Sequence, residues 1–511
     1  MKIYEKLEQL IQYGLRKKLI EDADVEFVRN DLLAILGLED WKSVSVEPVD
    51  DESPTAILAD ILDWAAENGI LPHNTVTYRD LLDTEIMGAF IARPSTIIKE
   101  FSQIYRESGP EAATKYFYHL SKDSNYIRTD RVAKNEHWFT KTAYGDLEIT
   151  INLSKPEKDP VAIAAERNQK KVGYPECLLC KENVGYAGRV NHPARQNHRI
   201  IPVDLDGEPW YLQFSPYVYY NEHAIVFSSE HKPMKISKDG FNRLLAFTEQ
   251  YPHYFVGSNA DLPIVGGSIL SHDHFQGGNH SFPMAKAEIE ESFTVKGFEE
   301  IEVGIVRWPM SVIRLRGKNR AQVADLAEYI TNQWKSYSDP EVEIIADTNG
   351  TPHNTVTPIV RRSGENFEFD IVLRNNRTNE KHPTGIFHPH AEVQHIKKEN
   401  IGLIEVMGLA VLPGRLKEEL QLVGEYLLTE DYEEKLRASE LTDKHADWAI
   451  QVKANYPELN SNNVEPILRD EVGKIFATVL EHAGVFKRTE SGQAAFRKFV
   501  QSITTPSVST K

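Results

Sequence analysis

Short runs in which apolar and polar residues alternate fill the middle of this chain, from about residue 126 to residue 412. Phe367, Phe369, Ile371 and Leu373 alternate with polar neighbours, and an extended strand places such residues on one face. Similar β-rich runs occur at 147–152, 210–214 and 224–227. The pattern predicts half-buried strands joined by polar turns.

Both ends of the chain show the three- and four-residue spacing of amphipathic helices. In the N-terminal region Gly37 stands where a helix ends, and near the C-terminus Gly484 does the same. The apolar residues with this spacing are Ile3, Leu7, Leu10, Ile11, Leu15, Leu32, Leu33 and Leu36, then Leu416, Leu420, Val423, Leu427, Val472, Ile475, Phe476, Val479 and Leu480. We therefore expect an α+β protein with helical terminal regions.

Composition excludes several classes of protein. The 511 residues contain 58 Lys and Arg against 76 Asp and Glu, a net charge of −18, and no basic block that would bind nucleic acid or a membrane surface. No apolar stretch approaches the length of a membrane span, and the first residues lack a signal-peptide core. We expect a cytoplasmic protein that grips any phosphate ligand by a local site.

The segment from Gly266 to Gly278 carries the sharpest chemical pattern. In an extended strand His272, His274 and Gln276 would project from one face. A neutral imidazole can attack phosphorus, and a nearby glutamine amide can donate to oxygens where negative charge accumulates. Hydrogen bonding of the other imidazole nitrogen to a backbone carbonyl would fix the tautomer. The alternative is a polar, histidine-rich turn, which does not account for the glutamine and the flanking glycines.

The only two cysteines, Cys177 and Cys180, are spaced so that both thiolates reach one metal ion. So few cysteines exclude a disulfide-stapled secreted protein. His231 follows a predicted strand and, with His272, would complete a tetrahedral site of two cysteines and two histidines. Such a metal would position the histidine strand rather than act as a Lewis acid. The alternative is a pair of buried thiols in a turn.

Two further groups leave their interpretation open. His353, His388 and His390, with Glu392, Gln394 and His395 nearby, indicate either a second metal site or a polar strand. Arg128 and Arg131 form either a fork for phosphate groups or an ordinary solvated surface. The concentration of His and Cys around 177–280 and again around 353–395 suggests a duplicated α+β unit, although no fixed-period repeat is evident.

Taken together, these motifs resemble the galactose-1-phosphate uridylyltransferase family, in particular its class II form. The resemblance extends over most of the chain, including the helical N-terminal region. The better-understood class I members belong to the histidine-triad superfamily. The motifs that carry the resemblance are Ser271-His-Asp-His-Phe-Gln-Gly-Gly278, Cys177-Leu-Leu-Cys180, Val226-Phe-Ser-Ser-Glu-His231, Arg307-Trp-Pro-Met-Ser-Val-Ile-Arg314 and His388-Pro-His390.

The resemblance implies a role for each candidate residue. His274 is similar to the histidine that becomes uridylylated, and Gln276 to the glutamine that steadies the intermediate. Cys177, Cys180, His231 and His272 resemble zinc ligands, and His353, His388 and His390 resemble ligands of a second metal, for which Glu288 or Glu290 would supply the carboxylate. Uridine-phosphate contacts are implied for Asn259, Gly266, Gly267 and Ser268, and an N-terminal arginine pair for Arg128 and Arg131.

In this sequence Asp273 replaces the proline of the class I motif, and Phe275 replaces a small residue. The spacing from Asn259 to His272 is also longer by two residues, which leaves the register of Ser268 open. Resemblance to the class II form does not by itself imply that either metal site of the class I enzymes is retained.

The family likeness further implies a fold and a reaction. We expect duplicated histidine-triad-like half-barrels with an antiparallel sheet, divided as a helical region at 1–120, a first half with the nucleophile at 121–300, a second half at 301–412 and a helical region at 413–511. The implied reaction of galactose metabolism converts UDP-glucose and galactose 1-phosphate to glucose 1-phosphate and UDP-galactose by double displacement. It requires no organic cofactor, and class I relatives suggest a homodimer.

Two rival functions remain at this point. A histidine-triad nucleotide hydrolase or phosphorylase would use the same histidine with a different acceptor. A non-catalytic protein organised by zinc would use the His and Cys residues only to hold its fold, and it leaves Gln276 unexplained.

Overall fold

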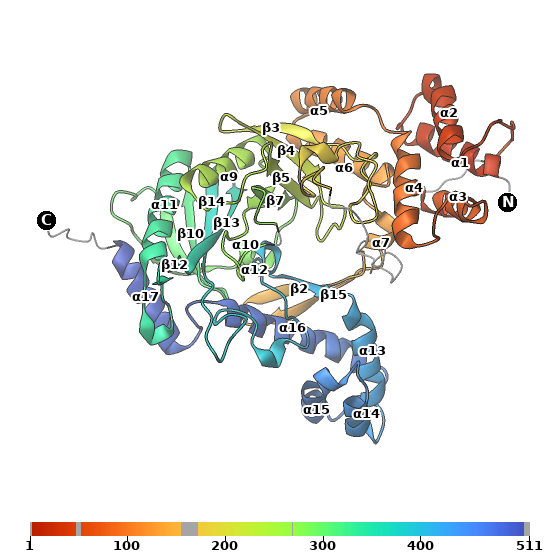
Figure 1. Ribbon diagram of the computed structural model, residues 1–511. Helices are drawn as coiled ribbons and strands as arrows, with labels where there is room; N and C mark the ends of the chain where they lie inside the picture. The colour runs from red at the N-terminus through yellow and green to blue at the C-terminus, as the bar shows by residue number, and fades with distance from the viewer. Residues whose placement is uncertain (1–2, 48–52, 155–171, 268, 505–511) are drawn as a thin grey trace. The chain divides into compact units, whose positions relative to one another are not determined.

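Figure 1 shows the computed structural model, which describes residues 3–47, 53–154, 172–267 and 269–504. Helices make up 42% and strands 19%, which confirms the predicted α+β class. The chain divides into two compact units, the first formed by Met1–Lys134 with Ser154–Lys232 and the second by Asn135–Leu153 with Pro233–Lys511. The duplicated half-barrels and the four predicted regions stay predictions.

The first unit begins with helices that share one apolar core. The residues Ile3, Leu7, Leu10 and Ile11 of the first helix are all buried in this core, as their spacing predicts. Gly37 has a φ of +62° directly after the second helix, where a left-handed residue ends the helical hydrogen-bonding pattern. The helices are α1 (Ile3–Arg16), α2 (Val25–Ile35), α3 (Thr55–Glu67), α4 (Val76–Gly88), α5 (Pro94–Ser108), α6 (Pro110–Asp123) and α7 (Thr129–Val132), with 3-10 turns η1 (Asp22–Asp24) and η2 (Lys181–Asn183).

Three antiparallel strands complete the described part of this unit in the order β3-β4-β5. They are β3 (Ile201–Leu205), β4 (Glu208–Phe214) and β5 (Ala224–Ser228). The hydroxyl group of Tyr126, just before α7, donates a 3.0 Å hydrogen bond to the carbonyl oxygen of Phe214 at the end of β4. The helical and strand parts of the first unit are thus joined by a buried polar contact.

The second unit contains a run of antiparallel strands in the order β7-β6-β13-β14-β10-β9-β8. Helices α9 (Lys238–Gln250) and α11 (Arg320–Ser336) pack against each other and against β13. The strands are β6 (Phe255–Gly257), β7 (His274–Gly278), β8 (Ile289–Phe293), β9 (Glu302–Val306), β10 (Val312–Gly317), β13 (Asn354–Ser363) and β14 (Asn366–Asn375), with a separate hairpin of β11 (Asp347–Thr348) and β12 (Thr351–Pro352).

Strand β14 departs from the expected half-burial. Its polar residues Glu368 and Asp370 are as buried as the apolar ones. Asp370 accepts hydrogen bonds from Arg314 at 2.7 Å and from Arg361 at 2.8 Å, so its charge is compensated inside the sheet. Alternation therefore located the strand correctly but predicted a solvent-facing side where an ion-pair network lies.

A smaller sheet of the second unit has the order β1-β2-β15, and β15 runs parallel to β2. Helix α16 (Val464–Ala483) packs against β1 and β2 and ends directly before Gly484, as predicted. The strands are β1 (Glu136–Thr142), β2 (Gly145–Asn152) and β15 (Leu409–Pro413). The other helices are α10 (Pro283–Lys286), α12 (Leu403–Val406), α13 (Arg415–Leu427), α14 (Tyr432–Ala438), α15 (Ala446–Asn455) and α17 (Glu490–Thr504), with η3 (Pro340–Val342), η4 (Ala391–Val393) and η5 (Asp443–His445).

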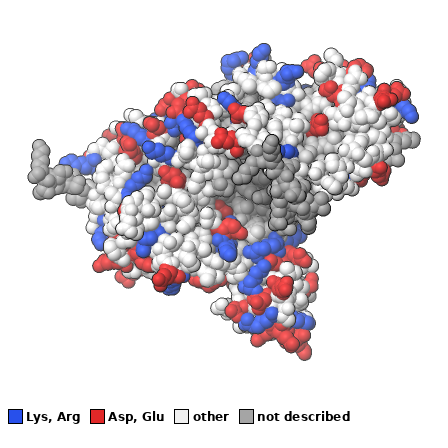
Figure 2. Space-filling view, viewed as in Figure 1, with Lys and Arg blue, Asp and Glu red and all other residues white. Residues whose placement is uncertain are grey.

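The surface carries charges of both signs. On the face shown in Figure 2, Lys and Arg are interspersed with Asp and Glu. Within the described ranges, no helix combines the length and the apolar composition that crossing a bilayer requires.

Candidate active site

A pocket of about 360 Å³ lies within the second unit, and His274 and Gln276 both line it. Both residues belong to β7, where alternate side chains project from the same face, as the sequence predicts. His272 precedes the strand instead of belonging to it, and its side chain is buried. The other lining residues are Asn259, Gly266, Gly267, Glu399, Asn400, Gly402, Leu403, Ile404 and Glu405.

The His274 ring is fixed in one tautomer. Its Nδ1 atom lies 2.8 Å from the backbone carbonyl oxygen of His272. Because a carbonyl oxygen only accepts hydrogen bonds, Nδ1 carries the proton and Nε2 of the neutral ring has the lone pair. Burial lowers the pKa of His274 to about 4, although the hydrogen bond to His272 opposes this. The ring is therefore neutral at pH 7 and chemically suited to attack an electrophile.

Close backbone packing explains the two glycines before the histidines. A Cβ atom on Gly267 would lie 2.6 Å from Nδ2 of Asn259, and one on Gly266 would lie 2.5 Å from the carbonyl oxygen of Ala260. Real Cβ atoms do not approach other atoms so closely, so larger residues would displace this wall. Ser268, also predicted to bind the substrate, lies outside the described residues.

Another part of the pocket wall comes from residues 399–405, a loop that runs into α12 and that the sequence did not single out. Asn259 accepts a 2.9 Å hydrogen bond from the backbone N–H of Leu403, which ties the loop to the strand side of the pocket. Glu405 accepts from the backbone N–H of Gly402 at 3.2 Å and from the buried Lys397 at 3.0 Å. The run Glu399-Asn400-Ile401-Gly402 has loop-forming residues, but nothing local connects it to a strand more than 120 positions earlier.

Three of the four predicted zinc ligands lie together in the first unit. The Sγ atoms of Cys177 and Cys180 are 3.5 Å apart, and Nδ1 of His231 lies 3.3 Å from Sγ of Cys180. Thiolates that share a tetrahedral zinc ion at ~2.3 Å would be about 3.8 Å apart, close to this spacing. Asn183 donates to the carbonyl oxygens of both cysteines at 2.8 Å, so one side chain braces both ends of the Cys177–Cys180 turn. These residues fit a structural zinc ion, with His272 of the second unit as a predicted fourth ligand.

The second predicted metal set is not assembled within the described residues. Both ring nitrogens of His353 lie 2.9 Å from other polar atoms, the Oδ1 of Asn376 and the Oγ1 of Thr348. Nε2 of His388 lies 3.2 Å from Oδ1 of Asn400, so His388 contacts a residue of the pocket.

His390 instead lies near Glu392, which the sequence indicated, and near two histidines, His382 and His482, which it did not. Its ring stacks on those of His382 and His482 at 4.0 and 4.2 Å, and its ligand atoms group with those of Glu392 and His482. His482 belongs to α16, 92 positions away in the chain. Neither Glu288 nor Glu290 belongs to this group, and Glu290 pairs with Arg488 at 2.7 Å.

The predicted arginine pair is held by acidic residues of the first unit. Arg131 forms a two-pronged ion pair with Asp80 at 2.6 and 2.9 Å, and Arg128 pairs with Asp83 at 2.8 Å. Burial raises the pKa of Asp83, and Arg128 offsets part of that effect. These pairs join α7 to α4, and the role of the arginines as phosphate ligands stays a prediction.

A mixed α+β chain with a buried neutral imidazole and a glutamine amide in one pocket has features of a group-transfer protein. Residues 18–233 match the family described as galactose-1-phosphate uridyl transferase, N-terminal domain, and residues 247–450 match its C-terminal domain. The chain belongs to the galactose-1-phosphate uridylyltransferase family, as its motifs predict.

Individual relatives match over almost their full length. A galactose-1-phosphate uridylyltransferase of Halalkalibacterium halodurans is 61% identical over 97% of this chain and 98% of its own. One of Bacillus subtilis is 56% identical, with 98% of each chain covered. One of Fusobacterium nucleatum is 55% identical over 98% of this chain and 99% of its own.

Proposed function

We propose that this protein is an enzyme that exchanges uridylyl groups, converting UDP-glucose and galactose 1-phosphate to glucose 1-phosphate and UDP-galactose. The observation that carries the proposal is the hydrogen bond from Nδ1 of His274 to the carbonyl oxygen of His272, which directs the lone pair to Nε2. Family membership and the names of the relatives support the substrates.

The first half-reaction forms a covalent adduct. Nε2 of His274 attacks the α-phosphorus of UDP-glucose, forming a P–N bond as the bond to the glucose 1-phosphate oxygen breaks. The leaving phosphate is weakly basic, so no strong general acid is required. The amide of Gln276 lies on the same strand face and would donate to the phosphoryl oxygens as charge accumulates.

The second half-reaction returns the enzyme to its starting state. A phosphate oxygen of galactose 1-phosphate attacks the uridylyl phosphorus, the P–N bond breaks, and the electron pair returns to Nε2. The ring is buried, which limits attack by water on the adduct. Glu399 and Asn400 provide oxygen acceptors at the pocket wall for hexose hydroxyl groups.

The proposal also includes a structural zinc site, further substrate contacts and the expected architecture. A zinc ion held by Cys177, Cys180, His231 and His272 would supply a structural cross-link that orders the segment before the nucleophile. Asn259, Gly266, Gly267 and Ser268 would contact the uridine phosphate, and Arg128 and Arg131 would approach it. Two related half-barrels and a homodimer complete the expected architecture.

Exchange of label tests the covalent step directly. With UDP-glucose and radioactive glucose 1-phosphate alone, label should enter UDP-glucose, and the peptide containing His274 should gain the mass of a uridylyl group. A hydrolase would release UMP and show no exchange, and a phosphorylase would need inorganic phosphate. Absence of both exchange and adduct would refute the mechanism.

A further inference from the structure

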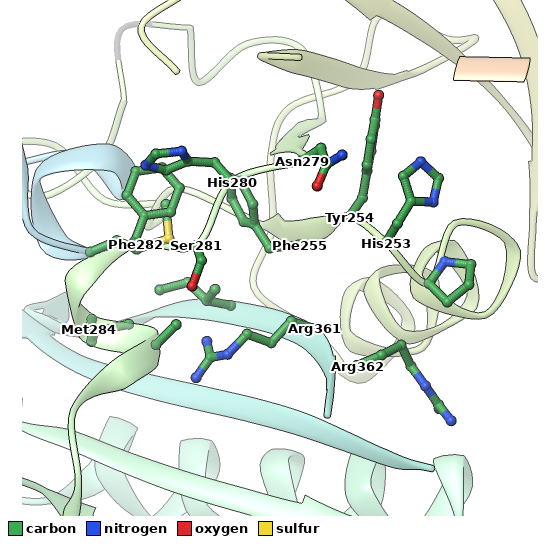
Figure 3. Close-up of a pocket in the computed structure, with 14 residues that line it drawn as sticks. His253, Tyr254, Phe255, Asn279, His280, Ser281, Phe282, Met284, Arg361 and Arg362 are labelled. Carbon is green, nitrogen blue, oxygen red and sulfur yellow. The ribbon is translucent and has the colours of Figure 1, made fainter. Parts of the chain in front are cut away.

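A second pocket, of about 310 Å³, lies in the second unit and shares no lining residue with the His274 pocket (Figure 3). Three chain segments and one further residue, Met407, form it. The residues that line it are Pro252, His253, Tyr254, Phe255, Asn279, His280, Ser281, Phe282, Met284, Ala285, Ile359, Arg361, Arg362 and Met407. The proposed uridylyl transfer assigns no role to any of them.

The floor of this pocket is apolar and well packed. Phe282, Met284 and Ile359 are each at most 2% exposed. The rings of Phe255 and Phe282 meet edge to face, with centroids 5.0 Å apart. Such a floor suits the flat or apolar part of a small ligand, since ligand pockets combine apolar surface with a few placed polar groups.

Basic side chains line the rim of this pocket. Its basic groups are His253, His280, Arg361 and Arg362, and no carboxylate occurs among the described residues that line it. The whole chain has a net charge of −18, and the His274 pocket is lined by two glutamates. Basic side chains that reach the pocket, while their partner carboxylates do not line it, favour an anionic ligand.

Arg361 is anchored so that its guanidinium has a defined position. Its Nη2 atom pairs with Asp370 at 2.8 Å and also with Glu368, which holds the group from one side. In Figure 3 this side chain runs beneath Ser281 toward Met284, whereas Arg362 extends in the opposite direction. A guanidinium has five N–H donors, more than these two contacts at Nη2 require.

His280 is held by a buried acid. Its Nε2 atom lies 3.0 Å from both oxygens of Glu148, so this nitrogen carries a proton. Although burial opposes ionisation, hydrogen bonds from His137 and His280 lower the pKa of Glu148 to about 2. The imidazole also packs on Phe282 with centroids 4.5 Å apart. The imidazole is thus fixed at the edge of the aromatic floor.

We propose that this pocket is a second ligand site that binds a small organic phosphate with a flat or apolar ring. The phosphate would contact Arg361 and His280, and the ring would lie on the Phe255 and Phe282 side. A nucleoside monophosphate has this chemistry, whereas a hexose phosphate has the charge but offers hydroxyl groups to the apolar floor.

The same structural elements connect this site to the nucleophile. Strands β6 and β7 pair at Phe255 with Gly278, beside the second site, and at Gly257 with Gln276, beside the first. Met407 directly follows α12, and Glu405 within α12 lines the His274 pocket. The second site therefore borders the same elements, β6, β7 and α12, that position Gln276 and Glu405.

Ser281 allows a matched pair of variants, because it is exposed and its side chain lies above Arg361 in Figure 3. Calorimetric titration with UMP should show binding at two sites of the wild-type protein. S281E places a carboxylate near the phosphate and should weaken one site about tenfold or more, whereas the neutral S281Q should retain both. Equal isotherms for S281E and S281Q would overturn the proposal.

Further probes identify the ligand class and separate this proposal from the proposed catalysis. AMP should show the same sensitivity to S281E as UMP, and glucose 1-phosphate, uridine and inorganic phosphate should bind this site more weakly. A crystal soaked with UMP should show phosphate density at Arg361, and density confined to the His274 pocket would contradict the site. Because the readout is binding, failure of label exchange would leave this result unaffected.

Discussion

Nδ1 of His274 donates a 2.8 Å hydrogen bond to the backbone carbonyl oxygen of His272, two residues earlier in the chain. This contact makes the orientation of the His274 ring a property of the local backbone rather than of a separate side chain. The strand that follows places Gln276 on the same side as the ring. The roles expected for His274 and Gln276 depend on this arrangement.

Replacing His274, the proposed nucleophile, should abolish transfer. We expect His274→Ala to lower label exchange by at least about a thousandfold, because no other group would form the P–N bond. His274→Gly should regain part of the activity when imidazole is added, since it leaves space for an external ring. Circular dichroism should show that both variants fold, and exchange by His274→Ala at the wild-type rate would disprove the assignment.

Gln276 should affect the rate of adduct formation more than substrate affinity. Removing a donor to the developing phosphoryl charge typically costs about a hundredfold to a thousandfold, which we expect for Gln276→Ala in single-turnover experiments. The isosteric Gln276→Glu should lose more, because its carboxylate repels the same oxygens. If both variants changed only the KM for UDP-glucose, the amide would have a binding role alone.

The pH dependence should reflect the buried imidazole. Because the pKa of His274 is lowered from 6.5 to about 4, the ring stays neutral down to that range. Adduct formation should then show no inflection from His274 near pH 6.5 and should fall through an apparent pKa near 4. A stopped-flow pH profile measures this, and a loss of rate centred near 6.5 would contradict it.

The same shift has a consequence for folding. In the unfolded chain His274 takes up a proton near pH 6.5, while the folded protein does not until about pH 4. The contribution of this residue to stability is therefore present above pH 6.5 and is lost as the pH falls toward 4. Urea unfolding of wild type and His274→Ala across this range should show the smaller pH dependence in the variant.

Metal analysis should find about one equivalent of zinc in the purified protein. Cys180→Ser should lose most of it and lower the melting temperature, because a thiolate is replaced by a weak ligand. Burial raises the pKa of the Cys180 thiol to about 12 without a metal, so zinc binding should release protons. His353→Gln provides a control that should retain the zinc, and a metal-free, fully active wild type would refute the site.

The buried ion pair between Lys397 and Glu405 should contribute strongly to the free energy of unfolding. The Lys397 side chain is 5% exposed and that of Glu405 is 11% exposed. Lys397→Met should reduce the free energy of unfolding by about 3–5 kcal/mol, because it leaves a buried carboxylate without its partner. Combining it with Glu405→Gln should recover part of that loss.

An exposed pair gives the matched control for this measurement. Lys318 and Glu365 lie 2.5 Å apart with side chains 72% and 80% exposed. Lys318→Met should change the free energy of unfolding by only about 0–1 kcal/mol, since water screens the pair. Equal effects of the two lysine substitutions in urea denaturation would show that the loop does not depend on the buried pair.

Local patterns predicted the features that depend on neighbouring residues alone. The spacing of Ile3, Leu7, Leu10 and Ile11 placed one helix face in the core, and Gly37 ended the next helix with a positive φ. His274 and Gln276 share a strand face because side chains alternate along an extended backbone. Family membership also followed from short motifs, since each is contiguous in the sequence.

The sequence by itself thus determined the types of the elements, the family and the strand that carries His274 and Gln276, because these follow from residue identity and from periods of two or 3.6 residues. Only the tertiary structure decided that Asn259 accepts a hydrogen bond from Leu403, that Asp80 pairs with Arg131, and that His390 stacks on His482. The physical reason is that such partners lie tens to more than a hundred positions apart, and packing of whole elements brings them together.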